Sequence, residues 1–115
     1  MDRRQLDRIA KALADPRRLD ILEAIARERE ISCKALGERF PVGLSTVSHH
    51  LKVLADSGVV RVRREGQFGY FSLDREVLRS FLQAVQWRLL ATLADPGPPE
   101  SGSRVMDLST KEVQS

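Results

Sequence analysis

The strongest constraint on the fold is a run in which a helical pattern gives way directly to two β-rich segments. Its first part, LSTVSHHLKVLADS, places Val47, Leu51 and Leu54 on one helix face, and a glycine follows as a stop. Its second part, VVRVRREGQFGYFSL, has β-rich stretches on either side of EGQ, which is typical of a β-hairpin. The run therefore predicts a helix over residues 44–57 and a hairpin over residues 59–73.

Three shorter helices are predicted before this run. Apolar residues at helical spacing surround the segment ADPRR, where Asp15 can cap a new helix and Pro16 suits its first turn. The segment CKALGERF predicts a third helix that stops before Pro41, and only PVG joins it to the next helix, which is typical of a helix-turn-helix. We expect a mainly α-helical domain with one β-hairpin, in the order α-α-α-α-β-β-α, over residues 1–94.

The last predicted helix carries more apolar surface than one stripe. Asp74 can cap it, and one of its faces is apolar at helical spacing: Leu78, Phe81, Leu82, Val85, Leu89 and Leu93. Trp87 and Leu90 fall outside that face, so we expect the additional surface to bury against a partner. Scattered exposed apolar residues are the alternative.

Charge and composition separate a folded part from a tail. The chain has 115 residues and a net charge of +3. The basic excess lies in residues 1–94, which favours an anionic partner, whereas residues 95–115 are rich in Pro, Gly and Ser and predict a disordered tail. A single cysteine excludes an internal disulfide, and neither a membrane span nor a signal peptide is visible, so we expect a soluble cytoplasmic protein without a membrane partner.

The adjacent histidines of the helix over 44–57 are poor candidates for metal binding or catalysis. His49 and His50 point about 100° apart on a helix and cannot converge on one ion. Ser45 and Ser48 are close in sequence, but no nucleophile elbow, paired carboxylates or phosphate-binding glycine loop accompanies them. We therefore expect no metal site, no cofactor and no enzyme activity.

The outward face of the same helix suits a nucleic acid better. Opposite the apolar ridge lie Ser45, His49 and Lys52, with Thr46 and Ser48 on the shoulders and His50 near the buried boundary. Small hydroxyls allow close approach to a surface, and His and Lys can donate to base edges or phosphates in a DNA major groove. A solvated surface helix is the alternative, but Arg61, Arg63 and Arg64 before the hairpin turn favour a wing on the flanking backbone.

Three segments together resemble the ArsR/SmtB family of bacterial winged-helix repressors: LADPRRLDIL, LSTVSHHLKVLADSGVVRVRREGQFGYFSL and the long closing helix. The resemblance covers roughly residues 6–93. It implies a winged helix-turn-helix homodimer on double-stranded DNA with an inverted-repeat operator. By position it implies DNA contacts from Ser45, Thr46, Ser48, His49, His50, Lys52, Arg61, Arg63, Arg64 and Gln67. It also implies a dimer interface built on the first and last helices from Leu6, Ile9, Leu13, Phe81, Val85, Trp87, Leu89 and Leu90.

The chain departs from the family at its known sensory sites. Where arsenic and cadmium sensors carry Cys-x-Cys, this chain has Ser32 and Lys34 with Cys33 between them, and its last helix has no histidine. Cys33 is interpreted as a small buried hydrophobe, with a redox role as the alternative. The favoured function is a sequence-specific dimeric transcriptional regulator that acts as a repressor. The competing function is a winged-helix interaction module or co-regulator that needs a partner protein.

Overall fold

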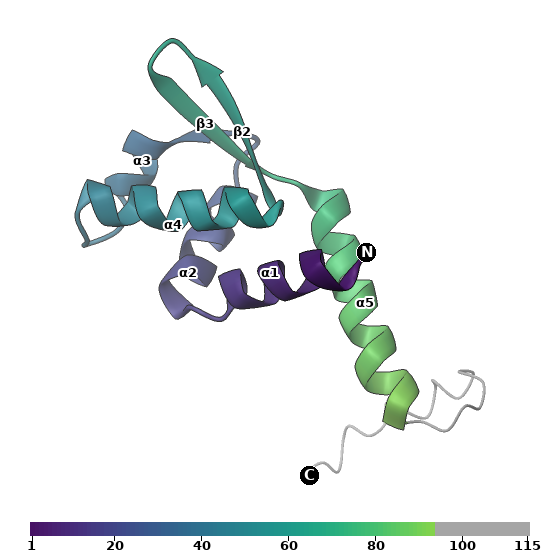
Figure 1. Cartoon of the computed structure of the whole chain (residues 1–115). Helices are drawn as coiled ribbons and strands as arrows, with labels where there is room; N and C mark the ends of the chain where they lie inside the picture. Colours follow the sequence, from purple (N-terminus) through teal and green to yellow (C-terminus); the bar gives the residue numbers. More distant parts are fainter. Residues whose placement is uncertain (94–115) are drawn as a thin grey trace. The chain divides into compact units, whose positions relative to one another are not determined.

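The computed structural model describes residues 1–93, which form five helices and three strands (Figure 1). The elements are α1 (Arg3–Leu13), α2 (Pro16–Ala26), β1 (Ile31–Ser32), α3 (Cys33–Gly37), α4 (Leu44–Ser57), β2 (Val60–Glu65), β3 (Phe68–Leu73) and α5 (Arg75–Leu93). Residues 1–82 form one unit, and the rest of α5 from residue 83 belongs to a second. The predicted tail, residues 95–115, lies outside the described residues. Among residues 1–93, no helix is long and apolar enough to span a bilayer.

The ends of the helices follow from local chemistry. Asp15 caps α2 as predicted, because its Oδ1 accepts hydrogen bonds from the backbone N–H groups of Arg17 at 2.8 Å and Arg18 at 3.1 Å. Pro16 occupies the first turn of α2, where its lack of a backbone N–H costs no hydrogen bond within the helix. The helix α3 ends at Gly37, so it is shorter than the CKALGERF pattern suggested.

The junction between α4 and β2 is tight. Gly58 ends α4 in the left-handed conformation with φ +94°, and a Cβ there would lie 2.9 Å from the Gln5 side chain. The buried Ser57 hydroxyl donates to the Leu54 carbonyl at 2.7 Å and accepts from the Val59 N–H at 3.3 Å. The Val59 carbonyl in turn accepts from the backbone N–H of Asp74 at 2.9 Å. Hydrogen bonds on both sides therefore fix the two-residue connection.

The structure adds one short strand to the predicted order of elements. The sheet is antiparallel with strand order β1-β3-β2, and β1 pairs Ile31 with Phe71 and Ser32 with Tyr70. Two residues are too few for a period-2 pattern, so β1 is formed by its pairing rather than by local preference. The hairpin β2–β3 has Gly66 in its turn at φ +63° and extends beyond α3 and α4 (Figure 1).

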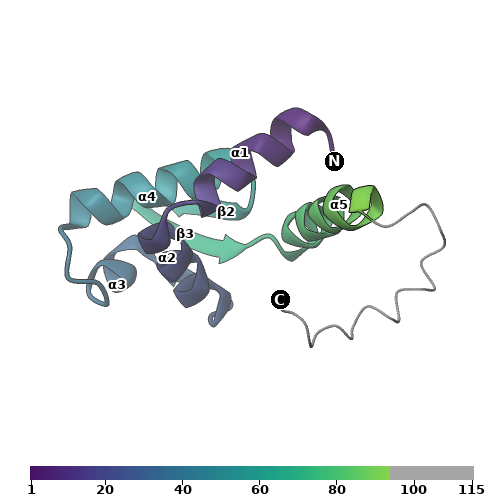
Figure 2. The same ribbon diagram turned by 90° about the horizontal axis from the view of Figure 1, so that it is seen from below.

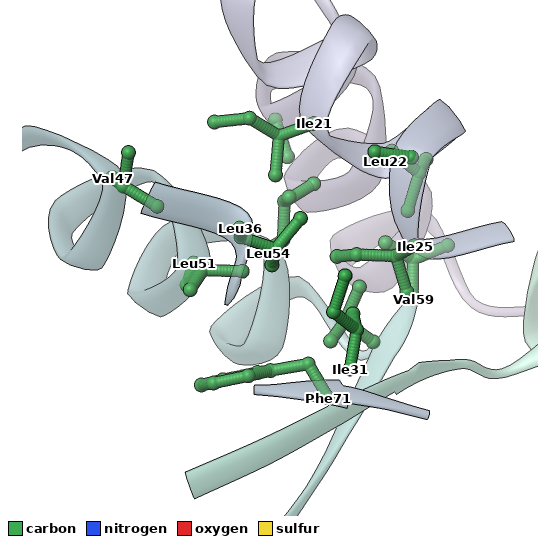
Figure 3. Close-up of a cluster of buried hydrophobic side chains, with 13 residues drawn as sticks. Ile21, Leu22, Ile25, Ile31, Leu36, Val47, Leu51, Leu54, Val59 and Phe71 are labelled. Atoms are coloured by element: carbon green, nitrogen blue, oxygen red, sulfur yellow. The ribbon is translucent and has the colours of Figure 1, made fainter. Parts of the chain in front are cut away.

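The core lies between α2, α3, α4 and the sheet (Figure 3). The predicted α4 ridge of Val47, Leu51 and Leu54 is at most 1% exposed. It packs with the buried side chains of the other elements, among them Ile21, Leu22, Ile25, Ile31, Leu36, Val59 and Phe71. The helix α1 runs alongside α4 (Figure 2). This packing fixes α4 along one face and leaves its opposite face open.

The residues predicted for a dimer interface differ in exposure. In α1, Ile9 is fully buried within the chain, whereas Leu6 and Leu13 are half-buried. Phe81, in the first part of α5, is also buried. Among residues 83–91, Val85 is half-buried, whereas the large apolar side chains of Trp87 (73% exposed), Leu89 and Leu90 are exposed. Ile9 and Phe81 therefore support the fold of the single chain, and the exposed side chains are the ones a partner can reach.

Candidate nucleic-acid interface

The helix α4 presents the predicted polar face to solvent. Ser45, Thr46, Ser48, His49 and Lys52 are all exposed. Their orientation follows from the burial of the apolar ridge on the other side of the helix. The face combines hydroxyl, imidazole and ammonium groups, which are the donors and acceptors that read base edges and phosphates.

The ammonium group of Lys52 is held only weakly. Its Nζ lies 3.2 Å from Asp56 Oδ2, one helical turn further along α4. Both side chains are exposed, and such surface pairs contribute between zero and about 1 kcal/mol. Lys52 can therefore exchange Asp56 for a phosphate at little cost.

His50 differs from His49 because it is half-buried against the start of α2. Its Nδ1 lies 3.5 Å from Arg18 Nη1, and Arg18 is itself held by a 2.7 Å hydrogen bond from its Nε to the Ala12 carbonyl. Since a guanidinium can only donate, Nδ1 must accept in this contact, which places the proton of a neutral His50 on Nε2. Burial lowers the pKa of His50 below its ordinary value, and the charges of Arg18, His49 and Arg17 lower it further against an opposing effect of Asp15.

This arrangement predicts that protonation of His50 opposes folding. The unfolded chain takes up the proton near the ordinary value of 6.5, and the folded chain does so only at lower pH. Stability is therefore expected to fall as the pH drops through about 6.5 and to level off below the folded-state pKa. Urea unfolding between pH 7.5 and 5 should show this loss in the wild-type chain and a smaller loss in His50→Gln. The exposed neighbour supplies the control: His49→Gln should keep the wild-type pH dependence, and equal profiles for all three chains would contradict the assignment.

Cys33 contacts α4, the helix whose outward face is predicted to bind DNA. It is the first residue of α3, is half-buried against the core, and its Sγ lies 3.4 Å from the Ser48 hydroxyl. The neighbouring Ser32 caps α3 by accepting a hydrogen bond from the Ala35 N–H at 3.1 Å. Within residues 1–93, no three His, Cys, Asp or Glu residues are grouped as metal ligands would be.

The three arginines of the hairpin have different surroundings. Arg61 pairs with Asp74 at 3.0 Å, and Arg63 forms two hydrogen bonds of 2.9 Å to the Glu30 carboxylate. Arg64 has no ion pair with any residue of the described chain, and its guanidinium lies beside Gly69 on the neighbouring strand. Gln67 is exposed in the hairpin turn. The structure thus leaves Arg64 as the arginine most available to an anionic ligand.

Two residues beside α4 and the hairpin were not predicted from the sequence to belong to the candidate site. Arg18 reaches His50 across 32 positions, and Glu30 reaches Arg63 across 33. No local spacing signals either contact, because both arise only when the fold brings α2 and β1 beside α4 and the hairpin. The pairs Arg61–Asp74 and Arg63–Tyr70 follow from hairpin pairing and strand order once the register is known.

An exposed polar helix packed on a shorter one and followed by an arginine-bearing hairpin defines a winged helix-turn-helix domain. A family model described as a helix-turn-helix domain matches residues 13–63. The chain is 31% identical over 84 residues to the transcriptional repressor SdpR of Bacillus subtilis, covering 73% of this chain and 89% of that protein. It is 36% identical over 78 residues to the arsenical resistance operon repressor of Staphylococcus xylosus, covering 68% and 74%.

A solved structure is similar over most of the chain. The solution structure of the homodimeric winged helix-turn-helix DNA-binding domain Mb0332 from Mycobacterium bovis, a possible ArsR-family transcriptional regulator, matches with a TM-score of 0.62. The two are 34% identical, and the match covers 82% of this chain and 91% of that one. Together with the arsenical and SdpR repressors, this shows that the chain belongs to the ArsR/SmtB family of winged helix-turn-helix transcriptional regulators, as its sequence indicated.

Proposed function

We propose that the chain is a sequence-specific DNA-binding repressor of transcription, active as a homodimer in the cytoplasm and without enzyme activity. The observation that carries the proposal is the exposed hydroxyl, imidazole and ammonium face of α4. A rigid helix with small side chains on its open face fits a major groove, where base edges present a distinct donor and acceptor pattern. In this proposal α4 reads bases, and β2–β3 contacts the flanking backbone as a wing.

Most of the residues assigned to DNA are exposed. Ser45, Thr46, Ser48 and His49 contact base edges, and Lys52 binds a phosphate after releasing Asp56. His50 contributes through its Nε2–H. From the hairpin, Arg64 and the exposed Gln67 meet the backbone, and Arg61 takes part to the extent that it leaves Asp74.

Dimerisation is proposed through α1 and α5. The exposed Trp87, Leu89 and Leu90 of α5 and the half-buried Leu6 and Leu13 of α1 supply the apolar surface. The homodimeric state of the Mycobacterium bovis domain supports this assembly. A twofold axis would set two α4 helices for successive major grooves, so the operator is expected to be an inverted repeat with half-sites about one helical turn apart.

The proposal is tested by the salt dependence of binding. Fluorescence anisotropy with a duplex from the chain's own promoter region should give an affinity about a thousandfold higher than a random duplex of equal length at physiological salt. Affinity for both duplexes should fall steeply as salt rises, because phosphate contacts release counterions. Equal, weak binding to both duplexes would contradict a self-sufficient repressor and would favour the alternative, a module that needs a partner protein.

A further inference from the structure

The outer face of the three-stranded sheet carries a lateral chain of contacts. Arg63 on β2 lies opposite Tyr70 on β3, and Tyr70 lies opposite Ser32 on β1. The Arg63 guanidinium sits 4.7 Å from the centre of the Tyr70 ring, and its Nε and Nη2 each donate to a different Glu30 oxygen at 2.9 Å. Glu30 immediately precedes β1, so a single side chain ties the hairpin to the opposite edge of the sheet.

The next residue points to the other face. Side chains alternate along a strand, so Arg64 shares the face of Val60 and Phe71, which are buried in the core. That face is the inner face of the hairpin, and Arg64 extends it beyond the core. Adjacent arginines therefore have separate surroundings, one bound to carboxylates on the outer face and one without an ion pair in residues 1–93 on the inner face.

The local charge around Arg63 does not suit a phosphate. Its guanidinium donates to Glu30 and also to Glu65 at 3.2 Å, so this group of three side chains has a net charge of −1. A bidentate, charge-assisted pair fixes geometry well. Because Arg63 is 52% exposed and Glu30 35%, the pair adds little to global stability and acts mainly on the orientation of the protruding hairpin.

We propose that Arg63 is a positioning residue that holds the wing against Glu30, and that Arg64 is the wing arginine that contacts DNA phosphate. This inference rests on the proposed DNA-binding function. The sequence predicted DNA contacts for both Arg63 and Arg64, and this inference assigns the contact to Arg64 alone. The stack on Tyr70 and the bond to Glu30 set the direction of the hairpin, and that direction sets where Arg64 meets the backbone.

The decisive variant is Glu30→Ala, because two models predict opposite results. If Arg63 contacted phosphate, loss of a competing carboxylate would strengthen DNA binding. If Arg63 positions the wing, affinity for the promoter duplex should fall about tenfold, the order of one lost specific contact, although the protein becomes more basic. Glu28→Ala is the matched control, since it removes one charge from the same loop and breaks a comparable exposed ion pair, with Arg39 at 3.1 Å.

Substitutions of the arginines complete the test. Arg63→Lys keeps the charge but loses the fork and the stack, so it should also weaken binding about tenfold, and the double variant with Glu30→Ala should be no weaker than either single one. Log affinity falls with log salt, and Arg64→Ala should make this dependence shallower, reducing the magnitude of the slope by about one. Tighter binding by Glu30→Ala than by Glu28→Ala, wild-type affinity in Arg63→Lys, or an unchanged slope in Arg64→Ala would overturn the assignment.

A measurement on the free protein separates this inference from DNA binding itself. Heteronuclear ¹⁵N relaxation should show residues 65–69 becoming more mobile in Glu30→Ala and Arg63→Lys, but not in Glu28→Ala. Unchanged mobility in both would overturn the positioning role even if DNA binding is confirmed. Conversely, failure of the wild-type chain to bind the promoter duplex would refute the proposed function. The relaxation measurement would still show whether the Glu30–Arg63 pair positions the hairpin.

Discussion

A His49→Glu variant is expected to bind the promoter duplex at least about a hundredfold more weakly than the wild-type chain. His49 lies on the exposed face of α4, where the proposed complex brings it to base edges and phosphates. A carboxylate at that position would be desolvated beside like charge, which costs several kcal/mol, and every 1.4 kcal/mol is tenfold in affinity. Fluorescence anisotropy at fixed salt measures the change.

The control for this variant makes the same change in net charge at a position outside α4. Arg27→Ala, at the exposed end of α2, also lowers the net charge by one. It should reduce affinity by no more than about threefold, because surface charges away from the contact are screened within about 8 Å at physiological salt. Similar losses for the two variants would show that only total charge matters and that α4 has no special role.

The largest effect on stability is expected from Leu54→Ala. Leu54 is 0% exposed and is the last residue of the α4 ridge, within the core beside α2 and the sheet. Removing a buried leucine side chain costs about 2–5 kcal/mol through lost burial and the cavity left behind. Urea unfolding at one fixed protein concentration should show this loss, the concentration being held constant because dimerisation would add to apparent stability.

The same helix supplies the matched control for Leu54. Leu44 at the first position of α4 is 55% exposed, and Leu44→Ala removes the same atoms. Its expected cost is below about 1 kcal/mol, because little area leaves water at this position on folding. Equal losses for the two variants would mean that α4 is not packed through the Val47, Leu51 and Leu54 ridge.

Much of the fold is readable from the sequence because its signals are local. The α4 ridge repeats at helical spacing, Asp15 and Pro16 mark the start of α2, and Gly58 marks the end of α4, and the structure confirms each of these. The strand β1 was not predicted, since its two residues become a strand only by pairing with β3. Tertiary pairing determines whether so short a segment becomes a strand, and two residues are too few to show a strand periodicity in the sequence.

The candidate site divides in the same way. The outward face of α4 follows from its ridge, because helix geometry relates the two faces. The state of the arginines does not follow from sequence, since Glu30 and Arg63 meet only after the sheet has formed. The burial of Ile9 within the single chain could not be predicted either, because its helical spacing is the same whether it faces the core or a second chain.

The short connection at Gly58 has a consequence for the length of DNA that each subunit recognises. Since Ser57 and Val59 are held by hydrogen bonds on both sides of this glycine, the start of β2 keeps a fixed position at the end of α4. In the proposed complex, a fixed distance would then separate the base pairs contacted by α4 from the backbone contacted by the start of the hairpin. Insertion of one base pair between them shifts the backbone by about 3.4 Å and rotates it. In the proposed complex, each subunit would therefore recognise a half-site of fixed length, and any adaptation to altered spacing would have to occur between the subunits rather than within one.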